Sequence, residues 1–206
     1  MVRVAVLVSG SGTNLQRILD AQKEGKLAPA EVALVVSNRK AAFALERAKA
    51  AGVESAVLSK AMEPDPVIWD EKLLALLRAR RIDLVVLAGF LMILGEKVVS
   101  AYENRIINIH PALIPSFSGL GFYGLRVHEA ALARGVKITG ATAHLVNRDV
   151  DGGPILIQKA VELLDGDTPE SLQRRVMEQA EWVILPKAVQ MAAGRLEEQK
   201  KAEERA

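Results

Sequence analysis

Short apolar runs that alternate with helical segments constrain the fold of this chain more than any other feature. Val4–Val8 is a β-branched and apolar run that ends in a glycine turn, and apolar residues then recur at helical spacing up to Gly25. The alternation returns with runs at 32–36, 56–58, 83–87 and 106–109 and helical segments at 41–51 and 69–80. Runs that are apolar on both faces are typical of parallel strands covered by helices on both sides. The sequence therefore predicts an α/β, Rossmann-like fold with a mostly parallel central sheet.

The last third of the chain has a different pattern. Residues 136–146 alternate polar and apolar side chains, and 155–161 is a further strand candidate. Thr168 and Pro169 are the residue types favoured at an N-cap and at the first helical position. We therefore expect a long C-terminal helix that runs past residue 190 and bends near Pro186.

Length and composition limit the organisation of the chain and its partners. A chain of 206 residues, half of them apolar, can form one sizeable core, so we expect a single domain at 1–190 followed by a charged, helical or frayed tail at 191–206. The net charge of +2 favours a small-molecule partner over nucleic acid or a membrane. The chain has no cysteine, which excludes disulfides and thiolate nucleophiles. No apolar stretch approaches the roughly 20 residues of a bilayer span, so we expect a cytoplasmic protein.

The segment SGSGTNL follows the first apolar run and opens the first helix. Backbone N–H groups and the helix dipole favour an anion at such a position. Leu15 replaces the third glycine of the dinucleotide-binding pattern, and residues 37–39 offer no acid for a ribose hydroxyl. A monophosphate held by Gly12, Thr13 and Asn14 therefore fits better than NAD or ATP, with a purely structural turn as the alternative.

Three polar residues could form a reaction centre. Asn108 and His110 lie at the end of an apolar run, where alternation points both side chains to the same side, and Asp151 stands in a glycine turn. Such a set suits acyl transfer to an amine, with the amide holding the developing oxyanion and the carboxylate orienting and charging the histidine. Equally, each could be structural, as a loop cap, a partly buried histidine or a turn residue. We expect His128, at the start of the helix after 119–127, and His144 to be structural or to support the site indirectly.

Several motifs resemble a known family when they are taken together. They are SGSGTNLQ, LAGFLMIL, NIHPALIP, VHEAAL, GATAHLV and DVDGGPIL, and they span about residues 1 to 190. In this order they resemble the folate-dependent formyltransferases, and within them the glycinamide ribonucleotide formyltransferases of purine biosynthesis. The resemblance implies transfer of the formyl group of 10-formyltetrahydrofolate to 5′-phosphoribosylglycinamide, without a metal. It implies no nucleic-acid or membrane partner and leaves a monomer and a homodimer both open.

The resemblance also assigns roles by motif position. Asn108, His110 and Asp151 would form the catalytic set, and Gly12, Thr13 and Asn14 would hold the phosphate. We expect Asp151 to raise the pKa of His110. The resemblance further implies that the ribonucleotide is contacted by Glu178, Gln179, Ala180 and Glu181. It implies that the folate is contacted by Leu91, Met92, Ile93, Leu94, Asn108, Asn147, Arg148, Asp149, Val150 and Asp151.

The chain departs from the family at two positions linked to folate, since Met92 and the segment around Pro66 lack the arginines found in relatives. Three other functions remain open on the sequence. The first is a hydrolase of 10-formyltetrahydrofolate, or another formyltransferase of the same fold. The second is a nucleotide-binding regulatory module that lacks catalysis, and the third is an NADP-linked oxidoreductase suggested by Arg39.

Overall fold

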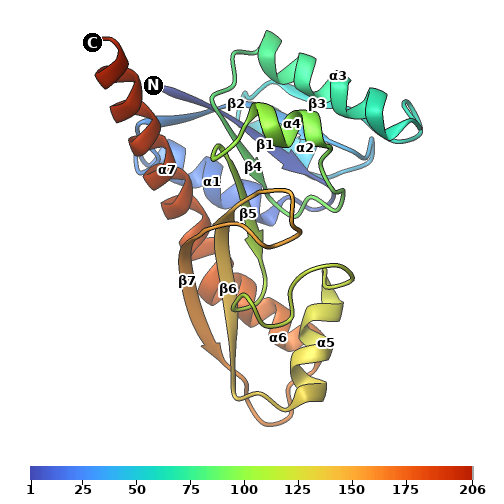
Figure 1. Ribbon diagram of the computed structural model, residues 1–206. Coiled ribbons are helices and arrows are strands. Elements are labelled where there is room, and N and C mark those ends of the chain that lie inside the picture. The colour runs from blue at the N-terminus through green and yellow to red at the C-terminus, as the bar shows by residue number, and fades with distance from the viewer. Residues whose placement is uncertain (206) are drawn as a thin grey trace.

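A computed structural model describes residues 1–205. Seven strands form one sheet: β1 (Val2–Val8), β2 (Ala30–Ser37), β3 (Ser55–Val57), β4 (Leu84–Leu87), β5 (Ile106–His110), β6 (Ile138–Leu145) and β7 (Ile155–Glu162). Their order is β3-β2-β1-β4-β5-β6-β7 (Figure 1). The first five strands pair in parallel, whereas β6 runs antiparallel to β5 and to β7. The predicted mostly parallel sheet is therefore confirmed.

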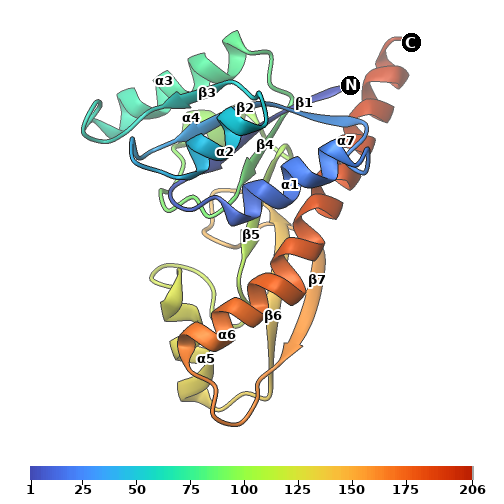
Figure 2. The same ribbon diagram turned by 180° about the vertical axis from the view of Figure 1, so that it is seen from behind.

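Helices cover both faces of the sheet, as predicted. They are α1 (Thr13–Lys23), α2 (Ala44–Ala50), α3 (Pro66–Ala79), α4 (Glu96–Ala101), α5 (Leu125–Arg134), α6 (Pro169–Val176) and α7 (Trp182–Glu203). One core cluster joins a face of the sheet to α1, α2, α6 and α7, and a second cluster joins the other face to α3 and α4 (Figures 1 and 2). Within the described residues, no helix is long and apolar enough to cross a membrane.

The long C-terminal helix departs from the prediction in one respect. It begins at Pro169 behind a Thr168 cap, as expected, but a π-helical turn at Met177–Glu181 interrupts it, and the sequence did not predict this turn. Pro186 lies in the second turn of α7, where it removes one backbone hydrogen bond inside an otherwise regular helix. The charged segment after residue 190 continues α7 to Glu203, and Ala206 lies outside the described residues.

Two further elements differ from the sequence prediction. α4 has only six residues, too few for a periodic pattern, and it was not predicted. α5 begins at Leu125, directly after Gly124 at φ 56°, so His128 lies inside the helix rather than at its start. Its side chain is buried.

The strand order determines where a ligand can bind. β1 lies between β2 and β4, so the chain leaves β1 toward one edge of the sheet and later returns to pair β4 on the other side. Ligands of open α/β sheets bind at the carboxyl ends of the strands beside such a reversal. The turn after β1, the loop after β4 and the end of β5 meet at this point.

Candidate functional site

A cavity of about 660 Å³ lies at the carboxyl ends of β1, β4 and β5. The predicted residues that line it come from five segments. These are Thr13 and Asn14 after β1, Leu91–Leu94 after β4, Asn108 and His110 on β5, Asn147–Asp151 after β6, and Glu181 on the C-terminal helix. The structure thus brings together in one cavity five segments that are far apart in the sequence.

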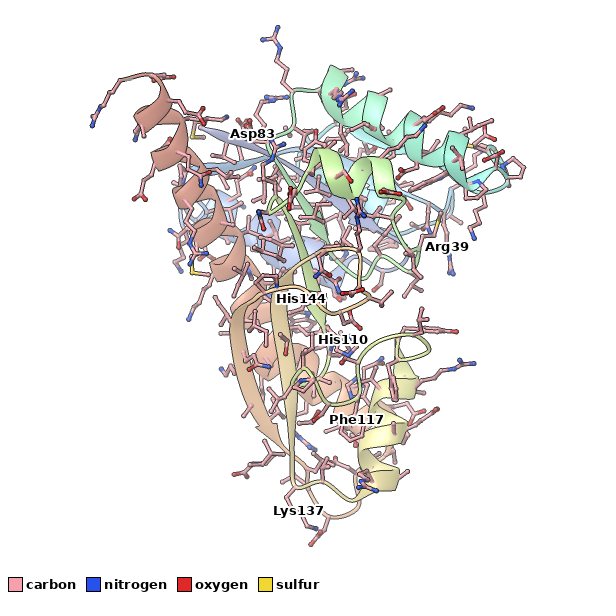
Figure 3. All side chains as sticks on the ribbon, viewed as in Figure 1. Arg39, Asp83, His110, Phe117, Lys137 and His144 are labelled. Atoms are coloured by element: carbon pink, nitrogen blue, oxygen red, sulfur yellow. The ribbon has the colours of Figure 1, made fainter. Side chains whose placement is uncertain are left out.

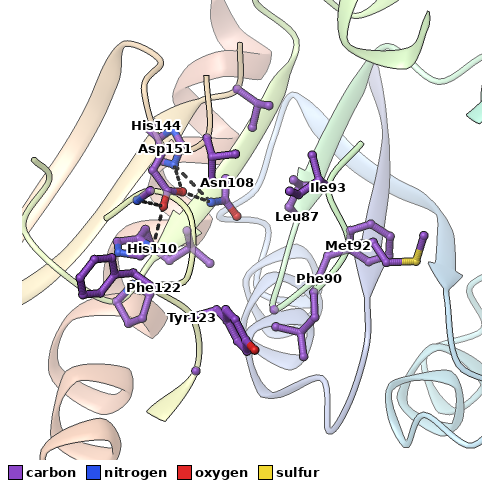
Figure 4. A pocket seen from close by; sticks show the side chains of 18 of the residues that line it. Leu87, Phe90, Met92, Ile93, Asn108, His110, Phe122, Tyr123, His144 and Asp151 are labelled. Carbon is purple, nitrogen blue, oxygen red and sulfur yellow. Dashed lines mark hydrogen bonds and ion pairs between the residues drawn. The ribbon is translucent and has the colours of Figure 1, made fainter. Parts of the chain in front are cut away.

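Asp151 is the centre of the polar cluster in this cavity (Figure 4). Its Oδ2 accepts a hydrogen bond from the Gly119 N–H at 3.0 Å and lies 3.4 Å from His110 Nδ1. Its Oδ1 accepts from Asn108 Nδ2 at 3.4 Å and lies 3.6 Å from His144 Nε2. Burial favours a raised pKa for Asp151, but the neighbouring His144 ring, the Gly119 amide and His110 outweigh it, so the pKa is lowered. The carboxylate is therefore ionised near neutral pH.

Asn108 and His110 point to the same side of β5, as predicted from strand alternation. Ile107 and Ile109, between and beside them, pack into the core on the opposite side. The neighbouring strand places His144 directly opposite Asn108, and Asn108 Nδ2 lies 3.2 Å from His144 Nε2. In Figure 4 the Asn108 nitrogen faces Asp151 and His144, and its oxygen is turned away from both. This orientation differs from the predicted one, in which the N–H group faces the substrate.

His110 is held by the loop that follows β5 (Figure 3). Its Nε2 lies 2.8 Å from the backbone oxygen of Phe117, and because a carbonyl only accepts, Nε2 carries a proton. Asp151 does act to raise the pKa of His110, as predicted, but the net shift of that pKa is downward. Burial is the larger influence and lowers the pKa, against the opposing effects of Asp151 and the Phe117 carbonyl. His110 is therefore neutral near pH 7.

Asn14 and Glu181 form a buried polar pair on another wall of the cavity. Asn14 Nδ2 donates to Glu181 Oε2 at 2.7 Å, which joins the start of α1 to the end of the π-helical turn. Burial raises the pKa of Glu181 to about 7, and the bond from Asn14 only partly opposes this effect. Thr13 lines the cavity beside them, whereas Gly12 adopts φ 71° just before α1 and does not line it.

Three of the four predicted contacts on the C-terminal helix do not line the cavity. Glu178 and Gln179 are exposed, and Ala180 packs in the core. Residues four apart share one face of a helix, so the face that carries Glu181 also presents Met177 and Gln173, which do line the cavity. The sequence analysis missed Met177 and Gln173, and counting back from Glu181 in steps of four residues would have identified them.

The predicted folate segment Leu91–Leu94 forms an apolar wall. Leu91 and Ile93 are 53% and 70% exposed, so this wall presents apolar surface to the open cavity. Two buried residues that the sequence did not single out hold the segment in place. Ser9 Oγ accepts from the Leu91 N–H at 2.8 Å, and the Asp70 carboxylate accepts from Gly95 and from two amides at the start of α4.

The second predicted folate segment, Asn147–Val150, faces this wall across the cavity mouth. Its fold is fixed locally, since the Asp149 N–H donates to Asn147 Oδ1 at 3.0 Å. Arg148 Nη2 reaches Glu96 Oε1 on α4 at 2.8 Å, and both side chains are exposed. The loop after β6 and the start of α4 are therefore linked across the mouth.

A smaller cavity of about 310 Å³ adjoins the first and shares Leu91, Met92 and Ile93 with it. Met92 and Pro66, where the family arginines are absent, both line it. Lys60 is the one basic residue among its lining residues in the described part of the chain. Lys60 therefore brings a positive charge to this smaller cavity.

His128 is a buried histidine that the sequence placed among structural residues. It lines the main cavity, is 1% exposed, and neither ring nitrogen has a hydrogen-bond partner within residues 1–205. Burial, together with the nearby His110, lowers the pKa of His128 to about 4. His128 therefore presents a neutral ring to the cavity.

Comparisons with known proteins show similarity over most of the chain. The family model described as formyl transferase matches residues 2–189. The phosphoribosylglycinamide formyltransferase of Haemophilus influenzae is 38% identical over 197 residues, which are 95% of this chain and 90% of that protein. The chloroplastic phosphoribosylglycinamide formyltransferase of Arabidopsis thaliana is 40% identical over 176 residues, 85% of this chain and 60% of that protein. The trifunctional purine biosynthetic protein adenosine-3 of Homo sapiens is 40% identical over 191 residues, and the chain spans only 18% of its length.

Solved structures are similar over most of the chain. Glycinamide ribonucleotide transformylase 1 from Symbiobacterium toebii superposes with a TM-score of 0.88 at 45% identity, covering 95% of this chain and 89% of that one. The transformylase 1 from Geobacillus kaustophilus superposes with a TM-score of 0.84 at 38% identity, covering 93% and 98%. The sheet and its surrounding helices are therefore shared with these two proteins.

Proposed function

The chain belongs to the formyl transferase family, and we propose that it transfers the formyl group of 10-formyltetrahydrofolate to the amine of 5′-phosphoribosylglycinamide. The products would be formylglycinamide ribonucleotide and tetrahydrofolate. The observation that carries this proposal is the gathering of Asn108, His110 and Asp151 on one wall of a single cavity. The other walls offer a helix N-terminus on one side and an apolar surface on the other, which suit a phosphate and a pterin respectively.

His110 and Asp151 would move the proton that the reaction releases. Because His110 is neutral and holds a proton on Nε2, the lone pair of Nδ1 is free to accept a proton from the attacking amine. The Asp151 carboxylate, 3.4 Å from Nδ1, would stabilise the imidazolium that forms. The same proton can then pass to the departing nitrogen, so the enzyme returns to its starting state.

Asn108 would orient the amine. Its oxygen is turned away from Asp151 and His144, and an amide oxygen accepts an N–H hydrogen bond from a neutral amine. That contact would hold the amine with its lone pair free to attack. Holding two substrates in one cavity in this way can account for roughly 7 to 11 kcal/mol of the barrier.

The ribonucleotide and the folate would occupy opposite sides of the cavity. Thr13, Asn14 and the start of α1 would hold the phosphate, and Glu181 would accept hydrogen bonds from the ribose. The apolar wall at 91–94 and the loop at 147–150 fit a flat ring, and bound 10-formyltetrahydrofolate would supply the electrophilic formyl carbon.

One assay tests the proposal. The protein is incubated with 10-formyltetrahydrofolate, with and without glycinamide ribonucleotide, and both tetrahydrofolate and formate are measured. We expect tetrahydrofolate to form only when the ribonucleotide is present, and without release of formate. Formate release in the absence of any amine would instead identify a hydrolase that uses water as the acceptor, and binding without turnover would identify a regulatory module.

A further inference from the structure

His144 is a buried polar residue beside the reaction centre that has no step of its own in the proposed transfer. Its side chain is 2% exposed, and it lies opposite Asn108 in the antiparallel pairing of β5 and β6. We propose that His144 is a positioning residue, and that its ring, with the hydrogen on Nδ1, fixes which end of the Asn108 amide faces the substrates. The catalytic meaning of this inference rests on the proposed formyl transfer.

The backbone determines which nitrogen of His144 carries the proton. His144 Nδ1 lies 2.9 Å from the backbone oxygen of Leu145. A carbonyl oxygen can only accept a hydrogen bond, so Nδ1 must donate one and must carry the hydrogen. In a neutral ring the other nitrogen, Nε2, is then an acceptor.

Nε2 in turn determines the orientation of Asn108. It lies 3.2 Å from Asn108 Nδ2, a distance at which a ring acceptor requires an N–H donor. The amide nitrogen has two hydrogens, and the second can reach Asp151 Oδ1 at 3.4 Å. Nε2 and Oδ1 lie 3.6 Å apart, beyond hydrogen-bond reach, so the amide nitrogen bridges two acceptors.

The Asn108 oxygen is consequently the end that remains for the substrates (Figure 4). If Nε2 carried a proton, the amide would have to turn over so that its oxygen accepted from the ring. The nitrogen would then face the cavity, and Asn108 would become a donor rather than an acceptor. His144 thereby decides whether Asn108 can accept an N–H from the attacking amine.

A direct measurement of the tautomer tests this inference without any turnover. The chain has only three histidines, so long-range ¹H–¹⁵N correlation spectra of histidine-labelled full-length protein can be assigned by comparison with His144→Gln and His128→Leu variants. We expect His144 to show the Nδ1–H tautomer and His110 the Nε2–H tautomer at pH 7.5. An Nε2–H or doubly protonated His144 ring would overturn the inference.

Kinetics of two matched variants test the consequence for Asn108. In His144→Gln an amide oxygen can replace Nε2 as acceptor, whereas the shorter side chain of His144→Asn reaches only the position of Nδ1. We expect kcat to fall roughly tenfold further in His144→Asn than in His144→Gln, which is the effect of one hydrogen bond. KM for the ribonucleotide should stay within about threefold in both variants, because its phosphate and ribose contacts lie elsewhere.

A double-mutant cycle separates positioning from a general structural role. In an Asn108→Ala background, replacing His144 by Asn should have little further effect on kcat, because the group that His144 positions is absent. Equal additive losses in the two backgrounds would overturn the inference. If the unmodified protein showed no formyl transfer at all, the proposed function would fail, and the tautomer measurement would still decide the orientation of Asn108.

Discussion

Two walls of the same cavity differ in whether their buried polar groups have hydrogen-bond partners within the protein. Around Asp151 every polar side chain has protein partners, so this wall is fixed before any ligand binds. On the wall formed by the start of α1 and the π-helical turn, Asn14 Oδ1 has no partner within residues 1–205, and Glu181 has only Asn14. The difference suggests that the first wall is preorganised for chemistry, whereas the second wall gains its remaining partners from a bound ligand.

The largest effect is expected from removing the charge at the centre of the preorganised wall. Asp151→Asn keeps the size of the side chain but can no longer stabilise a protonated His110, so we expect kcat to fall on the order of 10³-fold while the fold and ribonucleotide binding persist. Steady-state kinetics with both substrates and unfolding curves would measure this. Asp165→Asn, at an exposed residue outside the cavity, is the matched control. A near-native kcat in Asp151→Asn would refute the coupling to His110.

The second prediction tests the opposite wall through the pH dependence of stability. The pKa of Glu181 is raised from 4.5 to about 7 on folding, so the folded chain holds a proton that the unfolded chain has lost. This contribution to stability is complete below pH 4.5 and is lost as the pH rises to about 7. Glu181→Gln cannot ionise, so it should be more stable than the unmodified protein above pH 7 by up to about 3 kcal/mol.

Urea unfolding between pH 5 and pH 8 measures this effect. Glu178→Gln is the matched control, because Glu178 lies on the same helical turn but is exposed. Only Glu181→Gln should flatten the curve of unfolding free energy against pH. Parallel curves for the two variants would show that Glu181 is solvated or already ionised in the folded protein.

The sequence could predict those features of each wall that depend on residues close together in the chain. It could not predict the features that depend on contacts between distant segments. The shared side of Asn108 and His110 follows from alternation within one strand, and the sequence predicted it. The contact of His144 with Asn108 depends on the register between β5 and β6, which no local pattern specifies. The net lowering of the pKa of His110 depends on burial by the whole fold, which outweighs the raising effect of Asp151 that the sequence did predict.

On the apolar side of the site, too, the sequence predicted some features and missed others. The segment Leu91–Leu94 was found by motif, but of its anchors Ser9 directly follows β1 and Asp70 belongs to α3. Asp70 accepts three backbone N–H groups from Gly95 and the start of α4, which has no side-chain cap of its own. Capping by a side chain from a distant part of the same chain has no sequence signature, because the acceptor lies 25 or more residues from its donors.

A third, smaller effect is expected from His128. The pKa of its ring is lowered from 6.5 to about 4 on folding, so the folded chain stays neutral while the unfolded chain takes up a proton. The associated stability is intact above pH 6.5 and is lost as the pH falls to about 4. His128→Leu removes this loss, so at pH 4.5 it should be more stable than the unmodified protein by roughly 2 kcal/mol.

Thermal unfolding at pH 7.5 and at pH 4.5 distinguishes this from simple repacking. The gain in stability of His128→Leu should be present at pH 4.5 and small at pH 7.5. At pH 7.5 the histidine of the unmodified protein is neutral in both the folded and the unfolded chain. A gain of equal size at both pH values would mean that the leucine packs better, and that the histidine does not titrate as expected.

The smallest effect concerns the anchor of the apolar wall. Ser9→Ala removes the acceptor for the Leu91 N–H, which donates to it at 2.8 Å, and leaves a partly buried amide unpaired. A lost hydrogen bond of this kind costs about 1 kcal/mol, so we expect KM for the folate to rise roughly fivefold while kcat stays near the native value. Ser100→Ala, at an exposed position of α4, should change neither constant. A fall in kcat without a change in KM would instead place Ser9 beside the preorganised wall, and the separation of the two walls would then be wrong.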